Sequence, residues 1–497
     1  MLLSKIMRSI DYIEIVNRSG IDPDSIDLTT LSPDSRNISN DSIFVCISGS
    51  VNDGHNYVMN AYEAGCRVFV AERRPEALPD DVFVFITKNS RIALAQLSAA
   101  FFSFPADELT VIGVTGTKGK TTTSLLIYNI LLSGGIPVGY IGSNGITYDE
   151  LQKATLNTTP ESYELQKTMR DMVNAGVKVV VMEVSSQALK LGRVHGIKFD
   201  IAVFTNLSPD HIGEFEHADF DEYKNCKRSL FTDYGAKYVV YNADDEYAAE
   251  IVGASRCPKA SISGKGNTDA DYYADEVTFF RAPGKIAVNF TCKGLDGIFP
   301  ASLSFPGDFS VYNGLTAIAV CRRLGLEIAE IVDSMKNVRI KGRFETYELP
   351  NGATAVIDYA HNGVSLKAAL TALRNYEPNR LICLFGSVGG RTRMRRAELG
   401  LVASRDADFC IITSDNPDGE SPWAIIGEIA SYFTAGTAPY VAIPDRQKAI
   451  EYALQNSQKG DIILLAGKGH ESYQLICGNR IYFSEADIIA RFCAECK

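Results

Sequence analysis

A glycine-rich loop between a predicted strand and a predicted helix carries the clearest chemistry in the sequence. The loop 115–121 (TGTKGKT) follows the apolar run 111–114 and precedes apolar residues at helical spacing. Backbone N–H groups in such a loop and the helix N-terminus bind anions, and Lys120 adds a cation. Thr121 offers a hydroxyl to a nucleotide-bound Mg²⁺. Val114 stands where the general G-x-x-x-x-G-K-[ST] pattern has a glycine, yet the strand–loop–helix order predicts a nucleotide phosphate site.

Acidic and imidazole side chains follow the strands that we expect beside this loop. Glu183 ends the apolar run 177–183, and His211 follows the apolar run 201–204. Carboxyl ends of parallel strands meet at one edge of a sheet, so both side chains are expected near the phosphates. Glu183 is a candidate Mg²⁺ ligand, and a helix-capping glutamate is the weaker interpretation.

A lysine on the predicted helix 220–231 adds to this group. A buried lysine near two acids and a metal loses its charge or becomes modified, because desolvation favours the neutral amine. The residues alone do not decide between Lys224 and Lys227.

Polar loops also follow the predicted strands of the last third of the chain. The strands 355–358, 381–385, 409–412 and 462–466 alternate with helical patterns, which indicates a doubly wound parallel sheet. The loops that follow these strands are 358–361 (DYAH), 386–396, 414–418 (SDNPD) and 467–471 (GKGHE). We expect five arginines and lysines in these loops to neutralise phosphates and carboxylates of ligands.

The first hundred residues predict a smaller α/β domain. Its short apolar strands alternate with helical segments, and its polar motifs are 34–36 (DSR) and 49–55 (GSVNDGH). Arginine and hydroxyl groups on loops suit a ligand with phosphate and polar ring atoms. Turn chemistry alone is the alternative explanation for the D-S-R motif.

Length and composition narrow the class of protein. The chain has 497 residues, a length that predicts three domains. Its net charge is −11, and we expect no binding of nucleic acid, because nucleic acids bind basic surfaces. We expect no secretory signal and no membrane insertion, because no apolar run reaches about 18 residues. The eleven cysteines are scattered, many of them in apolar segments, which favours a reduced, cytoplasmic location.

Taken together, the motifs resemble the Mur ligase family over nearly the whole chain. They are D-S-R, G-S-x-x-D-G-H, T-G-T-x-G-K-T-T, N-T-T-P, M-E-V-S-S-x-A-L, T-N-L-x-x-D-H, G-R-F-E, D-Y-A-H, D-N-P and G-K-G-H-E-x-Y-Q. The resemblance implies a three-domain α/β protein. Its parts would be a UDP-sugar-binding domain over 1–106, a central P-loop ATPase with a mostly parallel sheet over 107–338, and a C-terminal Rossmann-like domain for the amino acid over 339–497.

The resemblance also implies a role for single residues. ATP would be held by Gly116, Thr117, Lys118, Gly119, Lys120, Thr121, Thr122, Asn313, Arg343 and Asp358. The UDP-muramoyl-dipeptide would be held by Ser35, Arg36, Asp53, His55, Thr158, Thr159, Ser185 and Arg193. The incoming amino acid would be held by Asp415, Asn416, Asp418, Gly467 and Glu471. The implied Mg²⁺ ligands are Thr121, Glu183, His211 and Lys227, the last as a carbamate, and the implied catalytic residues are Lys120, Glu183, His211 and Lys227.

The implied activity is that of an ATP-dependent, ADP-forming ligase in peptidoglycan precursor synthesis. It would add the third amino acid to UDP-N-acetylmuramoyl-L-alanyl-D-glutamate through an acyl phosphate, as a cytoplasmic monomer. Family members that add meso-diaminopimelate usually read D-N-P-R, and Asp418 replaces that arginine here. An aspartate would repel a distal carboxylate and favour an ammonium. We therefore expect L-lysine or another basic amino acid, with meso-diaminopimelate as the alternative.

Other departures keep further interpretations open. Asn362-Gly363 stands where the family usually has Thr-Pro, and the arginine-rich loop of the last domain lacks an aspartate after its first arginine. A divergent paralogue with another amino-acid substrate is therefore a further alternative. A folylpolyglutamate or cyanophycin synthetase would share the ATPase core without the D-S-R domain. A non-catalytic binding protein would be free to lose Lys120, Glu183 or His211, and all three are present.

Overall fold

The computed structural model describes residues 1–17, 20, 22–49, 52–76, 78–210, 212–213, 216–282, 284–390 and 393–495. The chain divides into two compact units, 1–262 with 319–321 and 263–318 with 322–497. Three large β-sheets that alternate with helices follow one another along the chain, as the sequence predicts, and a two-stranded hairpin lies near its end. The predicted boundaries at 106/107 and 338/339 stay predictions. None of the helices in the described ranges combines the length and the apolar character that spanning a membrane requires.

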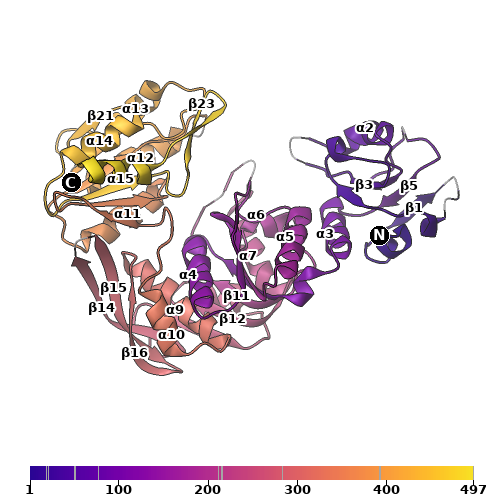
Figure 1. Ribbon diagram of the computed structural model, residues 1–497, viewed down its shortest axis with the longest axis horizontal. Coiled ribbons are helices and arrows are strands. Elements are labelled where there is room, and N and C mark those ends of the chain that lie inside the picture. The colour runs from indigo at the N-terminus through magenta and orange to yellow at the C-terminus, as the bar shows by residue number, and fades with distance from the viewer. Residues whose placement is uncertain are drawn as a thin grey trace. The chain divides into compact units, whose positions relative to one another are not determined.

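The N-terminal sheet has five strands in the order β1-β5-β4-β3-β2, and only β1 runs antiparallel to its neighbour. The strands are β1 (Glu14–Asn17), β2 (Thr30–Ser32), β3 (Ser42–Val45), β4 (Val68–Ala71) and β5 (Phe83–Ile86). The helices are α1 (Leu3–Met7), α2 (Val58–Glu63) and α3 (Ser90–Phe101). Figure 1 shows α2 and α3 beside β3 and β5. The inner strands β3 to β5 are wholly buried, which explains their unbroken apolar sequences.

The next sheet places the phosphate loop at its centre. Its strands in the first unit have the order β13-β12-β11-β6-β10-β7-β8-β9, and those from β13 to β7 are parallel. They are β6 (Thr110–Thr115), β7 (Val138–Gly142), β8 (Gly145–Tyr148), β9 (Leu151–Lys153), β10 (Val179–Glu183), β11 (Phe199–Phe204), β12 (Ala236–Asn242) and β13 (Lys259–Ser263). The helices are α4 (Lys120–Ser133), α5 (Ser162–Asn174), α6 (Ser186–Lys190), α7 (Phe220–Thr232) and α8 (Ala248–Val252). Helices α5 to α8 share one apolar cluster with the strands, and α4 lies on the other side (Figure 1).

The second unit starts with the antiparallel meander that alternating residues predict. Its strands are β14 (Tyr272–Ala282), β15 (Lys285–Gly294) and β16 (Gly297–Leu303). The helices α9 (Asp308–Arg323) and α10 (Ile328–Met335) follow along the chain. The Arg281 guanidinium on β14 donates to the carbonyl oxygens of Gly460 and Asp461, at 3.0 Å each. The meander is thereby tied to the C-terminal sheet of the same unit.

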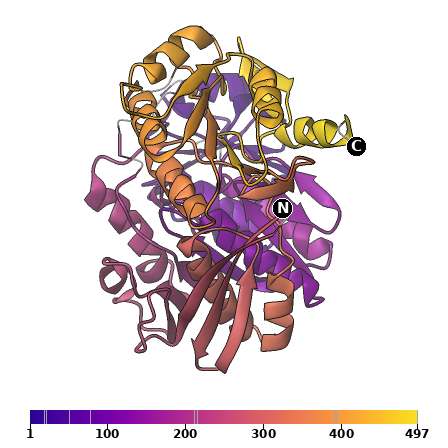
Figure 2. The same ribbon diagram turned by 90° about the vertical axis from the view of Figure 1, so that its left-hand side faces the viewer.

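The C-terminal sheet has the order β17-β18-β22-β19-β20-β21, and all of its pairs except β17–β18 are parallel. The strands are β17 (Glu345–Glu348), β18 (Thr354–Asp358), β19 (Leu381–Phe385), β20 (Phe409–Ile412), β21 (Tyr440–Ala442) and β22 (Ile462–Ala466), with the hairpin β23 (Tyr473–Ile476) and β24 (Asn479–Tyr482) beyond them. The helices are α11 (Gly363–Arg374), α12 (Arg393–Asp406), α13 (Pro422–Ala430), α14 (Arg446–Gln455) and α15 (Glu485–Glu495). Alternate strand residues join two apolar clusters, one with α11 to α13 and one with α14 and α15. The sheet is therefore covered by helices on both faces (Figures 1 and 2).

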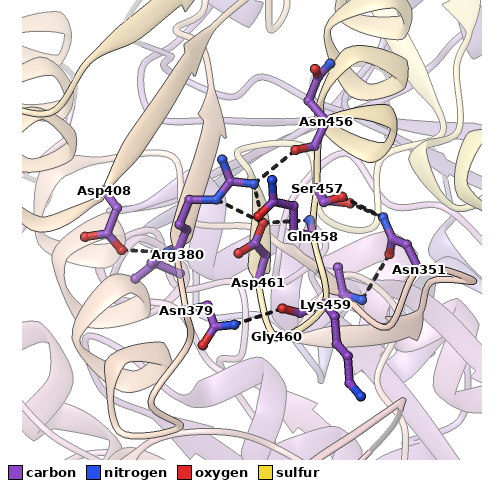
Figure 3. A network of polar contacts seen from close by, with 12 residues as sticks. Asn351, Asn379, Arg380, Asp408, Asn456, Ser457, Gln458, Lys459, Gly460 and Asp461 are labelled. Atoms are coloured by element: carbon purple, nitrogen blue, oxygen red, sulfur yellow. Dashed lines mark hydrogen bonds and ion pairs between the residues drawn. The ribbon is translucent and has the colours of Figure 1, made fainter.

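A polar network closes the amino-terminal ends of two central strands of this sheet (Figure 3). Arg380, just before β19, binds the buried carboxylate of Asp461, just before β22, with its Nη2 at 2.5 Å. The Asp408 carboxylate accepts from the Leu381 N–H at 2.7 Å. These contacts join the amino-terminal ends of the strands, whereas a doubly wound sheet binds its ligands in the loops at the opposite, carboxyl ends.

Candidate active site

The loop after β6 has the backbone of an anion cradle. Gly116 and Gly119 have φ values of 148° and 83°, which glycine adopts without strain. A Cβ at Gly116 would also collide with the Thr205 hydroxyl. The Lys120 ammonium lies over the loop and donates to the carbonyl oxygens of Gly116 at 2.8 Å and Thr117 at 3.0 Å. The strand β6, this loop and the helix α4 follow one another as the sequence predicts, and phosphate binding by Lys120 stays a prediction.

Neighbouring loops hold the cradle in place. The Asn206 carbonyl oxygen accepts from the Thr117 N–H at 2.8 Å, and its side-chain oxygen accepts from the Lys118 N–H at 2.9 Å. The Lys118 ammonium pairs with Asp210 at 3.0 Å. Thr122, half-buried in the first turn of α4, completes the predicted phosphate-binding set.

Glu183 ends β10 beside this loop, as expected. Its carboxylate is buried and accepts from the Thr121 hydroxyl at 3.0 Å, the Tyr140 hydroxyl at 2.6 Å and the Ser143 N–H at 2.8 Å. Within the described ranges no ion pair joins Glu183 to a cation. A buried carboxylate next to a hydroxyl is a fitting donor set for Mg²⁺. The predicted partner His211 lies outside the described residues, and the metal site stays a prediction.

The structure distinguishes the two candidate lysines of α7. Lys227 is 1% exposed, and its ammonium donates to the Gly116 carbonyl oxygen at 2.8 Å. Burial, reinforced by the charge of Lys120, lowers the Lys227 pKa well below its usual range. Lys224 instead pairs with Glu250 at 2.9 Å near the surface. Lys227 is therefore the lysine beside the phosphate loop, and its carbamate stays a prediction.

The residues predicted to hold the muramoyl-dipeptide gather at the end of β10. The Thr159 hydroxyl donates to the Glu183 carbonyl oxygen at 2.8 Å and accepts from the Ser185 N–H at 3.1 Å. Arg193 is 8% exposed and donates to the Thr159 carbonyl oxygen at 3.0 Å. The Thr158 hydroxyl lies 3.0 Å from that of Ser143. The Ser185 side chain caps α6, so Glu183 is not needed as a helix cap.

The predicted UDP residues form two groups in the N-terminal sheet domain. Arg36 pairs with Asp34 at 2.7 Å, which lowers the pKa of the Asp34 carboxyl to about 2. Ser35 begins the short 3₁₀ turn Ser35–Asn37. Asp53 binds the His55 ring at 2.6 Å and Arg73 at 2.6 Å. The hydrogen bonds of the described residues do not connect the two groups.

The three residues predicted to contact adenosine belong to the second unit. Asn313 is buried in α9. Asp358 ends β18, accepts from the Phe344 N–H at 3.1 Å, and has its pKa raised to about 6 by burial. The Arg343 guanidinium lies 4.9 Å from the centre of the Tyr359 ring. Their role toward ATP stays a prediction.

One cavity of about 540 Å³ brings together all five residues predicted to hold the amino acid. The predicted residues are Asp415, Asn416, Asp418, Gly467 and Glu471, and the cavity is also lined by Tyr359, His361, Arg395 and Arg480. The cavity lies at the carboxyl ends of β18, β19, β20 and β22, where a doubly wound sheet binds its ligands.

Two of the cations in these loops serve the fold rather than a ligand. Arg396 is 2% exposed and pairs with Glu420 at 2.6 Å and Glu428 at 2.9 Å. Lys468 is fully buried and pairs with Glu471 at 2.7 Å. The prediction that all five arginines and lysines neutralise ligand charge is therefore wrong for Arg396 and Lys468, which are buried and neutralise acids of the protein itself.

Sequence reasoning missed several residues of these sites. Tyr140 and Ser143 bind Glu183 from β7 and the turn after it, and no local pattern marks them as partners. Arg480 lines the same cavity as the five residues predicted to hold the amino acid, and it comes from β24. Cys477-Gly478-Asn479 lies between two apolar segments, a pattern typical of a hairpin turn. This pattern predicts that Arg480 lies on a hairpin that follows the G-K-G-H-E loop.

We expect the stability of the fold to depend on pH through the half-buried imidazole of His470. Its ring lies 4.9 Å from the Tyr359 ring, and burial together with Arg343 lowers its pKa to about 4. Between pH 6.5 and 4 the unfolded chain binds the proton and the folded chain does not, so acid destabilises the fold. We expect His470→Asn to remove about 3 kcal/mol of this loss, from 1.36 kcal/mol per pKa unit.

Urea unfolding across that pH range measures the effect. The matched control is His195→Gln, which should retain the dependence of the wild-type chain. An equal loss of stability toward acid in the His470→Asn and wild-type proteins would contradict the prediction.

Comparisons with known proteins agree with this architecture. The family model of the Mur ligase middle domain matches residues 114–321, and that of the Mur ligase glutamate ligase domain matches 342–469. The UDP-N-acetylmuramoyl-L-alanyl-D-glutamate–2,6-diaminopimelate ligase of Caldanaerobacter subterraneus subsp. tengcongensis is 39% identical, over 98% of this chain and 99% of its own. The ligase of the same name from Geobacillus thermodenitrificans is 38% identical, over 92% and 93%. A solved structure of a ligase of that name superposes with a TM-score of 0.72 and 26% identity, and covers 100% of this chain and 99% of its own.

These similarities include the N-terminal domain, because the first relative and the solved structure cover at least 98% of the chain. A synthetase that shares only the ATPase core is therefore not the better match. The chain belongs to the Mur ligase family, whose members are ATP-dependent, ADP-forming ligases.

Proposed function

We propose that this protein joins meso-diaminopimelate to the D-glutamyl carboxylate of UDP-N-acetylmuramoyl-L-alanyl-D-glutamate, with conversion of ATP to ADP and phosphate. The observation that carries the proposal is full-length similarity to ligases whose names state this reaction, at 39% identity over 98% of the chain. The loop after β6 and the charged cavity support the proposal, because they would supply the phosphate and amino-acid sites that the reaction needs. Such a reaction belongs to the cytoplasm, where the nucleotide substrates are made.

The reaction consists of two group transfers. An oxygen of the D-glutamyl carboxylate attacks the γ-phosphorus of ATP, and ADP leaves. A neutral amine of the amino acid then attacks the acyl carbon, phosphate leaves, and the nitrogen loses its proton. The first step brings a carboxylate close to a triphosphate, so charge neutralisation and positioning dominate the catalysis.

The residues of the first unit are suited to that task. The cradle N–H groups and Lys120 would hold the phosphate oxygens, while Thr159, Ser185 and Arg193 would position the dipeptide. Thr121 and Glu183 would hold Mg²⁺, which supplies further positive charge at the phosphates.

The sequence and the comparisons favour different amino-acid substrates. Asp418 favours L-lysine, whereas the relatives and the solved structure described above are all named for 2,6-diaminopimelate. The preference for L-lysine is therefore the less supported of the two expectations. We propose the alternative, meso-diaminopimelate, which requires a cation near Asp418 for the second carboxylate.

A reconstituted assay tests the proposed function. The purified chain, ATP, Mg²⁺, UDP-N-acetylmuramoyl-L-alanyl-D-glutamate and meso-diaminopimelate should release ADP and phosphate and form the tripeptide, detected by mass spectrometry. Omission of the nucleotide-linked dipeptide or of the amino acid should stop ADP release. Release of ADP that needs neither substrate, or that needs a folate and glutamate instead, would contradict the proposal.

A further inference from the structure

Asp418 anchors a hairpin over the amino-acid cavity. Its Oδ1 accepts from the Gly478 N–H at 2.7 Å, its own N–H donates to the Leu475 carbonyl oxygen at 2.9 Å, and its carbonyl oxygen accepts from the Cys477 N–H at 2.9 Å. Its φ of 50° lies in the left-handed region, which aspartate tolerates better than most residues. The aspartate therefore has a structural task that an arginine side chain would not perform.

The anchored hairpin brings Arg480 to the same cavity. Arg480 lies opposite Leu475 in the β23–β24 pair, and its guanidinium lies 4.7 Å from the centre of the Tyr473 ring. Both Arg480 and Arg395 line the cavity, and in the described part of the chain neither forms an ion pair with an acid. The cavity thus offers two guanidinium groups for carboxylates, whereas Lys468 is already paired with Glu471.

The number of free cations matches the number of carboxylates in the ligand. L-Lysine has one carboxylate, and a diamino dicarboxylic acid has two. The amine that attacks the acyl phosphate must be uncharged, so the acids of the cavity suit the other, distal amine, which stays an ammonium. Arg480 lines the same cavity as two of these acids, Asp415 and Glu471. A carboxylate on the same distal carbon as that ammonium would therefore meet Arg480.

We propose that Arg480 binds the distal carboxylate of the amino acid and selects a diamino dicarboxylic acid over L-lysine, and that Asp418 positions it through the hairpin. This inference rests on the proposed function. Asp418 then does not exclude an amino acid with a second carboxylate, because the Asp418 carboxylate already accepts a hydrogen bond from the Gly478 N–H. Arg480 supplies the positive charge that the arginine of the D-N-P-R pattern would otherwise provide.

Substitution of Arg480 separates the two amino acids. With ATP and UDP-N-acetylmuramoyl-L-alanyl-D-glutamate, the wild-type chain should prefer meso-diaminopimelate. Arg480→Gln should lower kcat/KM for meso-diaminopimelate by about 10- to 100-fold, the range for loss of a hydrogen-bonded charge pair, and change that for L-lysine by less than about threefold. Arg480→Lys keeps the positive charge but lacks the two parallel N–H donors of a guanidinium. Its kcat/KM for meso-diaminopimelate should lie between those of the wild-type chain and Arg480→Gln. The matched control is Arg405→Gln, an exposed arginine of α12 paired with Asp406, with no expected effect.

Substitution of Asp418 tests its positioning role. Asp418→Asn keeps an oxygen that accepts from Gly478 and should retain the preference, whereas Asp418→Ala should lose it as Arg480→Gln does. A strong loss in Asp418→Asn would show direct binding by the aspartate charge and overturn this role.

The outcomes distinguish this inference from the proposed function. A wild-type chain that releases no ADP with either amino acid overturns both. An active wild-type chain that prefers L-lysine overturns the role of Arg480 together with the proposed amino acid. An active wild-type chain that prefers meso-diaminopimelate, with an Arg480→Gln variant that changes equally for both amino acids or not at all, overturns the role of Arg480 alone. Melting curves show whether each variant is folded. If Arg480→Gln does not fold, Arg480→Lys allows the same comparison of kcat/KM for meso-diaminopimelate and L-lysine.

Discussion

Replacement of Glu183 by glutamine should lower the rate of ATP-dependent ADP release by about 100- to 1,000-fold, the range seen when one group that stabilises developing charge is lost. The Glu183 carboxylate is wholly buried and accepts hydrogen bonds from Thr121 and Tyr140. Glutamine has nearly the same shape but no charge, so the local hydrogen bonds are largely retained and the attraction for a cation is lost. Steady-state ADP release at several Mg²⁺ concentrations measures the effect.

Tyr140→Phe is the matched control for this substitution. It removes the 2.6 Å hydrogen bond to Glu183 and leaves the carboxylate charged. We expect it to lower the rate by about tenfold, the lower end of the range for loss of one hydrogen bond to a charged group. Glu183→Gln should also need more Mg²⁺ for half-maximal rate, and Tyr140→Phe should not. Activity within tenfold of wild type in Glu183→Gln would contradict the assignment of Glu183 to the metal site.

Much of the fold was predictable because parallel strands buried on both faces leave unbroken apolar runs in the sequence. The runs that end at Glu183 and Asp358 were found for this reason, and β10 and β18 end at these residues. Polar residues directly after such strands then had to meet at one edge of a sheet. The amino-acid cavity confirms this argument, because loops from four strands line it.

The remaining features depend on pairings between distant segments, which local patterns do not encode. Arg396 and its acid partners are 24 and 32 residues apart, so the sequence does not show that this arginine is already neutralised. The sequence predicts that the Asp418 charge faces the ligand, because the hydrogen bond of Asp418 to Gly478, 60 residues later, leaves no pattern in the sequence.

Replacement of Arg446 by methionine should destabilise the protein by about 3–5 kcal/mol, the cost of leaving a buried charge without its partner. Arg446 and Glu485 are 0% and 1% exposed, and the Arg446 Nη2 lies 2.8 Å from the Glu485 carboxylate. The variant leaves that carboxylate buried and uncompensated. Urea or thermal unfolding measures the loss. Arg446→Met combined with Glu485→Met should regain much of it, since neither charge then remains.

The same substitution should weaken amino-acid binding, because Arg446 fixes two loops of the cavity. Its guanidinium donates to the carbonyl oxygens of Ser414 at 3.0 Å and Ala466 at 2.8 Å. The residues that follow these two, Asp415 and Gly467, line the cavity. We expect Arg446→Met to raise KM for the amino acid and leave KM for ATP unchanged, and the double variant to recover stability without recovering KM.

Arg380→Met is the matched control for this last prediction. Arg380 also pairs with a buried carboxylate, that of Asp461, but at the amino-terminal ends of the strands (Figure 3). It should lower stability and leave KM for the amino acid unchanged. In the described part of the chain its side chain binds Asp461 and Asn456, and neither of them lines the cavity. If both variants raise KM in proportion to their loss of stability, Arg446 acts on the fold as a whole. A rise confined to Arg446→Met shows that the arginine positions the loops that hold the amino acid.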